Sequence, residues 1–258
     1  MPEGDTVWRA ATNLNAALAG AVLTRCDVRV PESATVDLSG ETVVSVVSVG
    51  KHLLMRVGEW SIHSHLKMEG SWHLYSHGSA WKRPAHQARI VLETADWVAV
   101  GFSLGVTEIV PTARESEVVG YLGPDLLGPN WDSAEAVARL TAQPSTPIFV
   151  ALLDQRNLAG LGNEYVNELC FLRGMLPERE VANSDVEATV ALARKLILAN
   201  RDRTERTTTG DTRAGRRSWV YGRAGRPCRR CGTRIRFGSL GATPLQQRDT
   251  YWCPTCQV

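Results

Sequence analysis

The sequence predicts an α+β protein of two domains, the second of which ends in a small metal-binding segment. Three observations support this fold class: short β-rich runs fill residues 21–110, helical periodicity dominates beyond residue 130, and two cysteine pairs lie close to the C-terminus. We expect a β-sandwich domain at 1–128, a helical domain at 129–222 and the metal-binding segment at 223–258.

The first half of the chain begins with one helix and continues as strands. The helix is expected to start at a cap formed by Asp5 or Thr6 and to end at Gly20, with one apolar face made of Val7, Ala10, Ala11, Leu14 and Leu18. Short β-rich runs follow at 21–30, 42–49, 53–57, 60–66, 88–92 and 97–102. Such a series is typical of a β-sandwich or barrel, with helices flanking it.

The second half has helical periodicity after a Gly/Pro-rich boundary at 122–129. We expect a helix at 133–141, one at 147–155 capped by Thr146, one at 164–173 closed by Gly174, and one starting at Ser184, where Glu187 completes a capping box. Residues 207–217 lack any period and are expected to form a mobile loop that shapes a binding pocket.

Composition and charge narrow the class of function. The 258 residues are 43% hydrophobic, enough for a core, yet the apolar stretches fall short of the ~18–20 residues of a membrane span. The acidic start Met-Pro-Glu-Gly-Asp is unlike an export signal, so we expect a cytoplasmic protein. Residues 1–200 carry 16 basic and 23 acidic side chains, against 13 and 4 in 201–258. This asymmetry favours a polyanionic partner such as nucleic acid, although an arginine-rich codon bias would give the same imbalance.

Four of the six cysteines form two matched pairs, Cys228-x-x-Cys231 and Cys253-x-x-Cys256, separated by 21 residues. Four thiolates at this spacing make a closed tetrahedral site for one structural Zn²⁺, which folds the chain and does no chemistry. A redox motif and disulfides are the alternatives. Two matched pairs in a basic tail without an export signal favour zinc, and zinc requires a reducing compartment.

A glycine-rich turn precedes one predicted helix in the second half. Gly160 and Gly162 permit backbone angles that other residues resist, and Asn163 then opens the helix. Free N–H groups at such a helix start, together with the helix dipole, can hold a phosphate. Glycines end helices in many proteins, so the turn alone is weak evidence and gains weight from the basic segment that follows.

Separate motifs in order along the chain carry a family resemblance: Pro2-Glu3-Gly4-Asp5-Thr6-Val7, Gly50-Lys51-His52, Leu152-Leu-Asp-Gln-Arg followed by Ala-Gly-Leu-Gly-Asn163, and the cysteine pairs. The chain resembles the Fpg/Nei DNA glycosylases, on the endonuclease VIII (Nei) side and of an actinobacterial kind. The resemblance implies a β-sandwich, a helix-two-turns-helix element and a zinc β-hairpin. It also implies damaged DNA as partner, and we expect a nucleoid-associated monomer.

The resemblance assigns chemistry to residues near the start of the chain. Removal of the initiator methionine would leave Pro2 with a free secondary amine, whose unperturbed pKa is about 8. The resemblance implies that this amine attacks C1′ of the damaged nucleotide and forms an iminium ion. That cation acidifies the C2′ proton, so the strand breaks by β,δ-elimination after base excision. The family role of Glu3 is proton exchange with the opening sugar, and Lys51 contacts phosphate and donates a proton.

Further positions match DNA-binding residues of the family. Arg248, between the cysteine pairs, corresponds to an arginine that grips the phosphates flanking the lesion and assists δ-elimination, while Gly162 and Asn163 lie at the phosphate-binding turn. Lys67 and Met68 fall on the loop that fills the gap left by the flipped base, for which an unbranched apolar side chain is suited.

Some positions depart from the family pattern. Endonuclease VIII has Gln-Leu-Tyr where this chain has Lys67-Met-Glu69, Tyr121 replaces an arginine that contacts DNA, and Thr6 with Phe102-Ser-Leu-Gly105 differs from the Fpg branch. These differences disfavour 8-oxoguanine opposite cytosine and leave oxidised pyrimidines as the expected substrates, in duplex or single-stranded DNA.

Two alternative functions stay open. The first is a zinc-containing protein that binds damaged DNA without catalysis, suggested by Lys67-Met-Glu69 and opposed by intact Pro2, Glu3 and Lys51. The second is an arginine-rich zinc protein that binds RNA. Separately, His63-x-His65 would place two imidazoles on one strand face, where a second metal site is conceivable.

Overall fold

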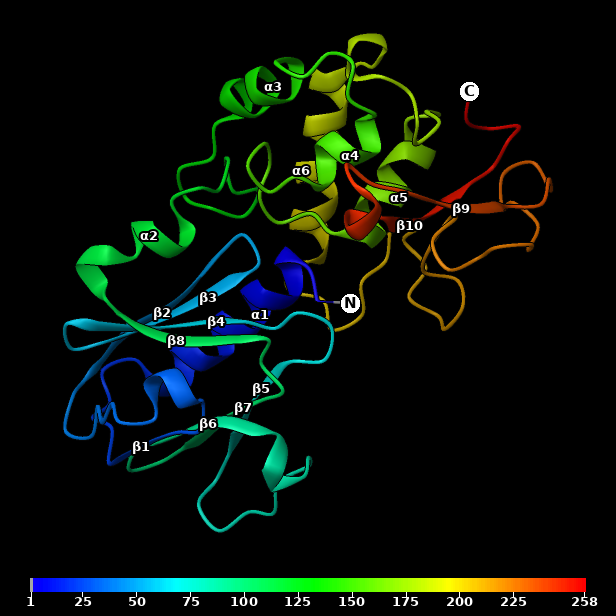
Figure 1. Cartoon of the computed structure of the whole chain (residues 1–258). Helices are drawn as coiled ribbons and strands as arrows, with labels where there is room; N and C mark the ends of the chain where they lie inside the picture. The colour runs from blue at the N-terminus through cyan, green and yellow to red at the C-terminus, as the bar shows by residue number, and fades with distance from the viewer. Residues whose placement is uncertain (1) are drawn as a thin grey trace. The chain divides into compact units, whose positions relative to one another are not determined.

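The computed structural model describes residues 2–258 and divides the chain into two compact units. The first unit ends at Tyr121 and the second begins at Leu122 (Figure 1). We propose, from the sequence, that the second unit is further divided near residue 222. None of the helices within residues 2–258 is long and apolar enough to cross a membrane.

Helix α1 (Gly4–Leu18) opens the first unit. Its cap position is Glu3, so the expected cap at Asp5 or Thr6 is wrong by two or three residues. Asp5 instead lies in the first turn, where its Oδ1 accepts the backbone N–H of Thr6 at 2.7 Å. A carboxylate there interacts favourably with the helix dipole. The buried face is close to that predicted and contains Val7, Ala11, Leu14 and Leu18, and the chain leaves the helix at Gly20 with φ 83°.

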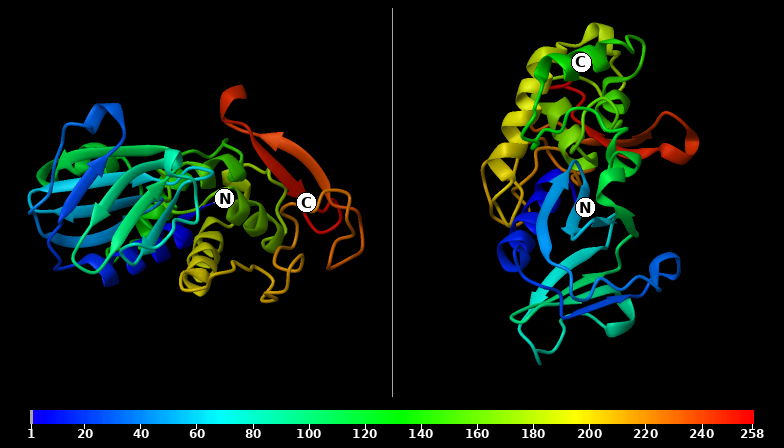
Figure 2. Two further views of the ribbon diagram at one scale, coloured as in Figure 1. Left: turned by 90° about the horizontal axis from the view of Figure 1, so that it is seen from below. Right: turned by 90° about the vertical axis from the view of Figure 1, so that its left-hand side faces the viewer.

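Two antiparallel four-stranded sheets form the rest of this unit, as the predicted sandwich requires (Figure 2). One sheet has the order β1–β6–β7–β5 and the other β2–β3–β4–β8. The strands are β1 (Arg25–Val28), β2 (Val43–Val49), β3 (His52–Val57), β4 (Trp60–His65), β5 (Ser71–Tyr75), β6 (Ala88–Glu93), β7 (Val98–Phe102) and β8 (Val106–Pro111). Strands β5 and β8 were not among the predicted runs, because histidine, glutamate and proline interrupt their apolar pattern.

The two sheets and α1 share one apolar core. Side chains that alternate along β3, such as Leu53, Met55 and Val57, pack with Ile90 of β6 and Leu14 of α1. The opposite face of the β2–β3–β4–β8 sheet carries His52, His63 and Glu108 among apolar residues such as Leu54. Short helical segments complete the unit: three 3₁₀ turns at Pro31–Ser33, Ala85–Gln87 and Thr112–Arg114, and α2 (Ser116–Val119).

The second unit is mainly helical and ends in a β-hairpin. Its elements are α3 (Ser133–Thr141), α4 (Ile148–Leu153), α5 (Asn163–Leu172), α6 (Val186–Asn200), β9 (Arg236–Leu240) and β10 (Arg248–Trp252), with 3₁₀ turns at Val181–Asn183 and Pro244–Gln246. The hairpin is antiparallel and pairs Arg248 with Leu240, so the connection 241–247 forms its tip.

Two predicted helix caps are wrong. The cap position of α4 is Pro147 rather than Thr146, because Pro147 has an extended ψ of 133° and the first helical residue is Ile148. Helix α6 is capped by Asp185, whose carboxylate accepts the N–H of Ala188 at 3.1 Å, and not by Ser184. The ionised carboxylate is the stronger acceptor at a positive helix end.

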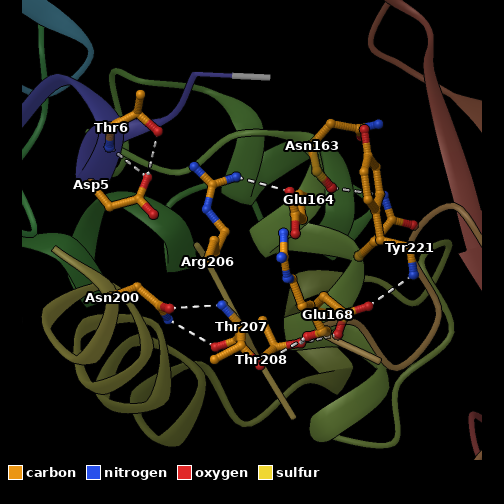
Figure 3. Close-up of polar contacts among 12 residues, drawn as sticks. Asp5, Thr6, Asn163, Glu164, Glu168, Asn200, Arg206, Thr207, Thr208 and Tyr221 are labelled. Carbon is orange, nitrogen blue, oxygen red and sulfur yellow. Dashed lines mark hydrogen bonds and ion pairs between the residues drawn. The ribbon is translucent and has the colours of Figure 1, made fainter. Parts of the chain in front are cut away.

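The segment 207–217 contains the expected irregular backbone, but its hydrogen bonds do not fit the expected mobility. The N–H of Thr207 donates to Oδ1 of buried Asn200 at 2.8 Å, and the Asn200 amide donates to the Thr207 carbonyl at 3.0 Å (Figure 3). The N–H of Thr208 reaches the carbonyl of Arg217 at 2.9 Å and closes the loop. Polar side chains therefore satisfy a backbone that lacks helical or strand partners.

Candidate functional site

The N-terminal segment fixes two of the predicted site residues. Pro2 is half-buried and Glu3, at the cap position of α1, is 0% exposed. The Glu3 carbonyl accepts the N–H groups of Thr6 and Val7 at 3.0 and 3.1 Å, so the first helical turn holds the Glu3 backbone. Because Glu3 follows Pro2 directly, a buried carboxyl lies one residue from the proline nitrogen. Met1, which must be removed if Pro2 is to act as predicted, lies outside the described residues.

Lys51 lies in the two-residue turn that joins β2 to β3. Val49 and His52 pair across the hairpin and leave Gly50 and Lys51 as the central residues. Gly50 has φ 59°, the positive angle that a type II′ turn needs at its first central position and that glycine adopts without strain. The turn places the half-exposed Lys51 at the end of the hairpin.

A series of hydrogen-bonded side chains crosses the same sheet on the face that carries His52 and His63. Glu108 Oε1 lies 2.6 Å from His63 Nδ1, His63 Nε2 lies 2.7 Å from His52 Nδ1, and His52 Nε2 lies 3.1 Å from the Tyr121 hydroxyl. With Glu108 ionised, each N–H or O–H donates toward Glu108, which assigns one tautomer to each imidazole. The sequence alone does not predict this series of hydrogen bonds, because its members lie on separate strands and at the end of the unit.

The two histidines beside Lys51 are held neutral. Burial is the main cause that lowers the pKa of His52 to about 3, and burial together with the charge of Lys67 lowers the pKa of His65 to about 4. Both ring nitrogens of His63 are engaged in this series of hydrogen bonds, which leaves neither for a cation. The geometry gives no support to the conceivable metal site at His63 and His65.

The turn between β4 and β5 presents two more predicted residues. Lys67 has φ 53°, a left-handed angle that is uncommon for a side-chain-bearing residue, and its N–H donates to His65 Nδ1 at 2.9 Å. The next residue, Met68, is 64% exposed. A large apolar side chain is thus held outward on a tight turn.

In the second unit, the predicted glycine turn leads into α5 as expected. Gly160 has φ 111°, Gly162 is the cap residue, and Asn163 is the first helical residue, only 5% exposed. One turn later, Asn167 donates to the Asn163 carbonyl at 2.8 Å. Gly162 and Asn163 therefore lie side by side at a helix N-terminus, where the dipole attracts negative charge.

Asn167 also joins α5 to the hairpin, a role that the sequence analysis missed. Its Oδ1 accepts the N–H of Tyr251 at 2.6 Å, and its amide donates to the carbonyl of Asp249 at 3.0 Å. Arg248, the first residue of β10, is exposed and donates to the neighbouring Gln247 carbonyl at 2.8 Å. The predicted phosphate-gripping arginine is therefore presented to solvent from a strand that α5 holds.

The four cysteines converge as predicted. Among residues 2–258 they form the one group of candidate metal ligands whose atoms all lie within 4.8 Å of one another. The Sγ atoms of Cys228 and Cys256 are 4.0 Å apart, and those of Cys231 and Cys253 are 3.4 Å apart. Zn–S bonds of about 2.3 Å in a tetrahedron put sulfurs about 3.8 Å apart, so the set fits zinc.

The chemistry of the four sulfurs also fits a dication. Desolvation raises the pKa of Cys253 and raises that of Cys256 to about 12, so these two thiols hold their protons unless a cation compensates the thiolate charge. The side chain of Gln257 braces the site, since it accepts the N–H of Cys253 at 2.8 Å and donates to the Met175 carbonyl at 2.8 Å.

A buried carboxylate on α5, unrecognised in the sequence analysis, organises the segment before the cysteines. Glu168 is 0% exposed and accepts hydrogen bonds from the Thr208 hydroxyl and from the backbone N–H groups of Trp219, Val220 and Tyr221 at 2.7–2.8 Å (Figure 3). Burial raises the pKa of Glu168, and these hydrogen bonds oppose the rise. An acidic residue on the apolar face of a helix was the signal that could have identified it.

Comparisons with known proteins agree on one group of relatives. Residues 1–103 match the protein family described as the formamidopyrimidine-DNA glycosylase N-terminal domain. The chain is 55% identical to "DNA-(apurinic or apyrimidinic site) lyase Nei2" of Mycolicibacterium smegmatis, covering 100% of this chain and 99% of the relative. It is also 55% identical to "Probable endonuclease 8 2" of Streptomyces coelicolor, covering 100% and 94%.

A solved structure shares the whole fold. "Structure of MutM in complex with carbocyclic 8-oxo-G containing DNA" superposes with a TM-score of 0.81 over 100% of both chains, at 22% sequence identity. At that identity the likeness concerns the α+β architecture of two units, which is the fold class that the sequence predicts.

Proposed function

The chain belongs to the Fpg/Nei family of DNA glycosylases, and from this premise we propose that it is a bifunctional DNA glycosylase and AP lyase of base-excision repair. The substrates are oxidised pyrimidines in DNA. The observation that carries the proposal is a fully buried Glu3 directly after Pro2 at the start of α1, because an amine nucleophile and a proton-exchanging carboxyl must be adjacent and fixed.

The reaction follows from the chemistry of these two residues. After methionine removal, the Pro2 nitrogen attacks C1′, and the damaged base leaves with the C1′–N bond electrons and a proton. Glu3 exchanges a proton with the opening sugar ring. Because Pro2 is a secondary amine, the product is a cationic iminium that draws electrons from C2′. Loss of a C2′ proton then expels the 3′ phosphate, and a second elimination expels the 5′ phosphate.

Charged and polar residues would hold the DNA backbone during these steps. Lys51, at the β2–β3 turn, supplies an ammonium for a phosphate and a proton for elimination. Arg248 offers a guanidinium that can grip a phosphate with two hydrogen bonds. The N-terminus of α5 at Gly162 and Asn163 adds the positive end of a helix dipole.

Met68 is the candidate wedge. A base inside a duplex must be flipped out before its C1′ is reached, and the vacated space must be filled. The exposure and turn geometry of Met68 support this role, with Lys67 beside it for the phosphate backbone.

The cysteine cluster would hold one structural Zn²⁺ through Cys228, Cys231, Cys253 and Cys256. Such an ion stabilises the fold of the hairpin and leaves no open coordination position for substrate. We further propose that the enzyme acts as a monomer on DNA at the cytoplasmic nucleoid.

Borohydride trapping tests the proposed nucleophile. With DNA that contains an abasic site, we expect wild-type protein to give a covalent adduct that mass spectrometry maps to the Pro2 peptide, and protein with a chemically blocked N-terminal amine to give none there. An adduct on Lys51 in the wild-type protein would refute the assignment. A protein that binds the oligonucleotide without cutting it would be the non-catalytic damage binder, and tighter binding to RNA than to abasic DNA would favour the RNA-binding alternative.

Glu3→Gln separates the two half-reactions. We expect base excision to fall by about 100-fold or more, because the buried proton donor is lost, while cleavage of a preformed abasic site falls less. Equal activity of Glu3→Gln and wild type on thymine glycol DNA would show that Glu3 has no role in the chemistry.

A further inference from the structure

The turn 66–70, which carries Met68, is restrained from within. The N–H of Gly70 donates to the Leu66 carbonyl at 2.8 Å, and a Cβ at Gly70 would lie 2.4 Å from that carbonyl oxygen, so a side chain cannot be placed there without moving the backbone. Lys67, with φ 53°, supplies the left-handed residue of the turn. The N–H of Lys67 attaches the N-terminal side of the turn to His65 at the end of β4, which leaves the C-terminal side, at Glu69, to be attached.

Arg83, in the connection between β5 and β6, makes that attachment. Its Nη1 donates to the Glu69 carbonyl at 2.8 Å and to Ser71 Oγ at 3.1 Å, on the C-terminal side of Met68. Its Nη2 donates to Ser103 Oγ at 3.2 Å, and its Nε donates to Gln87 Oε1 at 2.9 Å. One planar guanidinium thus joins three connections of the sandwich.

The β7–β8 turn that Arg83 reaches is itself in contact with the Met68 turn. Ser103 has φ 47°, and its N–H donates to the Gln87 carbonyl at 2.8 Å. The N–H of Gly105 donates to the His65 carbonyl at 2.9 Å, and a Cβ at Gly105 would lie 2.1 Å from Cγ of Lys67. Two left-handed residues, Lys67 and Ser103, therefore lie on touching turns linked by Arg83.

We propose that Arg83 is a positioning residue for the Met68 wedge and so determines how well the enzyme opens duplex DNA. This inference rests on the proposed function. A wedge that replaces a flipped base has to keep its place in the helix, and a turn that is already ordered loses less conformational entropy on insertion. Arg83 acts through Met68 and is not itself required to touch DNA.

Arg83 is expected to position the turn mainly through the shape of its guanidinium and less through its charge. Four acceptors on three segments are reached by a fork of five N–H donors in one plane, which a lysine ammonium cannot reproduce. Arg83→Lys keeps the charge and most of the stem but loses the fork. It therefore separates positioning from a direct phosphate contact.

The experiment compares single-turnover excision and cleavage at one thymine glycol in duplex and in single-stranded DNA. We expect Arg83→Ala and Arg83→Lys to lower the duplex rate by about 10- to 100-fold and to leave the single-strand rate within about twofold of wild type, because a correctly placed wedge is needed only where a base must be unstacked from a duplex. Met68→Ala should show the same pattern. Arg89→Ala is the matched control, since Arg89 on β6 donates to the His86 carbonyl and is not bonded to either turn.

A double-mutant cycle gives the sharper result. If Arg83 acts through Met68, Arg83→Ala combined with Met68→Ala should be no slower on duplex DNA than the slower single variant. Additive losses, or wild-type duplex activity of Arg83→Lys, would overturn the proposal. Stopped-flow fluorescence of 2-aminopurine beside the thymine glycol should show slower unstacking in both Arg83 variants, and unchanged unstacking would equally overturn it.

Two controls keep this outcome separate from others. If circular dichroism shows that Arg83→Ala does not fold, the same rates are measured with Arg83→Lys and with Ser103→Ala. The Ser103→Ala substitution removes only one acceptor of Arg83. If wild-type protein cuts neither DNA, the proposed function fails. If wild type cuts both and the variants match it on both, only the role of Arg83 fails.

Discussion

The two units hold their exposed functional side chains by different means. In the first, Lys51 and Met68 lie on turns of an eight-stranded sandwich with a large apolar core. In the second, Arg248 lies on a two-stranded hairpin, and such hairpins are marginal in water by themselves. The buried cluster beside that hairpin is small and includes two of the four clustered cysteines: Phe171, Val220, Cys228, Ile235 and Cys253. The sandwich that carries Lys51 and Met68 is stabilised by packing of its core. The hairpin that carries Arg248 depends on a few specific links, namely the cysteine site and the hydrogen bonds of Asn167.

Two arginines illustrate the difference. Arg83 in the first unit donates to four acceptors and is committed to its own protein. Exposed Arg248 in the second donates to the neighbouring Gln247 carbonyl. An arginine that is exposed is suited to a phosphate, while one that donates to four acceptors of its own protein is suited to position other groups.

Loss of the metal link should have the largest effect. With Cys253→Ser, or after chelation, we expect residues 223–258 to lose amide protection in hydrogen-exchange mass spectrometry while the first unit keeps it, because binding of structural zinc contributes on the order of 10 kcal/mol. DNA affinity should fall with it. Cys26→Ser in the first unit is the control. Protection of the hairpin that survives both treatments would contradict the comparison.

Loss of the Asn167 link should be smaller. Asn167→Ala leaves the N–H of Tyr251 and the carbonyl of Asp249 without their partner, at a cost of about 1–3 kcal/mol in the unfolding free energy of the second unit. Thermal unfolding measures this loss. Asn183→Ala, at an exposed asparagine of the same unit, should be nearly neutral, and equal effects of the two substitutions would show that the bridge to β10 contributes nothing.

The first unit should respond to acid through its neutral histidines. His52 and His65 have pKa values of about 3 and about 4 in the fold against about 6.5 in an unfolded chain. The unfolded state therefore binds more protons between pH 6.5 and 4, and stability falls as pH falls through that window. Because one proton contributes at most about 1.4 kcal/mol per pH unit, we expect a slope below that limit for each histidine. His52→Gln should flatten this slope in denaturant unfolding at pH 7 to 5, and an unchanged slope would exclude His52 as a source.

The smallest expected change concerns Arg248. Arg248→Ala should weaken DNA binding and reduce the slope of log affinity against log salt by about one, the contribution of one phosphate contact. Fluorescence anisotropy over a salt series measures it. Arg114→Ala, at an exposed arginine paired with Glu117 in the first unit, should leave the slope unchanged. An unaltered slope in Arg248→Ala would remove phosphate binding from its role.

Local patterns in the sequence were sufficient for much of the fold and for the cysteine site. The face of α1, the helices α3 and α5 and six strands follow from periodicity and turn residues, which act within a few positions of the chain. Strands β5 and β8 were missed because most of their residues are only half-buried and their partners lie elsewhere in the sequence: Glu108 in β8, for example, pairs with His63 in β4. The cap of α6 was misplaced by one residue because Ser184 and Asp185 are both good caps.

The sequence by itself determined which residues are chemically able to act: a proline before a glutamate, a lysine in a glycine turn, four cysteines in matched pairs and an arginine between them. Residue type and short spacing carry that information. Only the tertiary structure decided which polar groups hold these residues in place. The groups concerned form hydrogen bonds with partners that are not their neighbours in sequence: Arg83, Asn167, Glu168 and the His52–His63 pair. A buried hydrogen bond depends on where both partners are placed, and folding alone sets that placement.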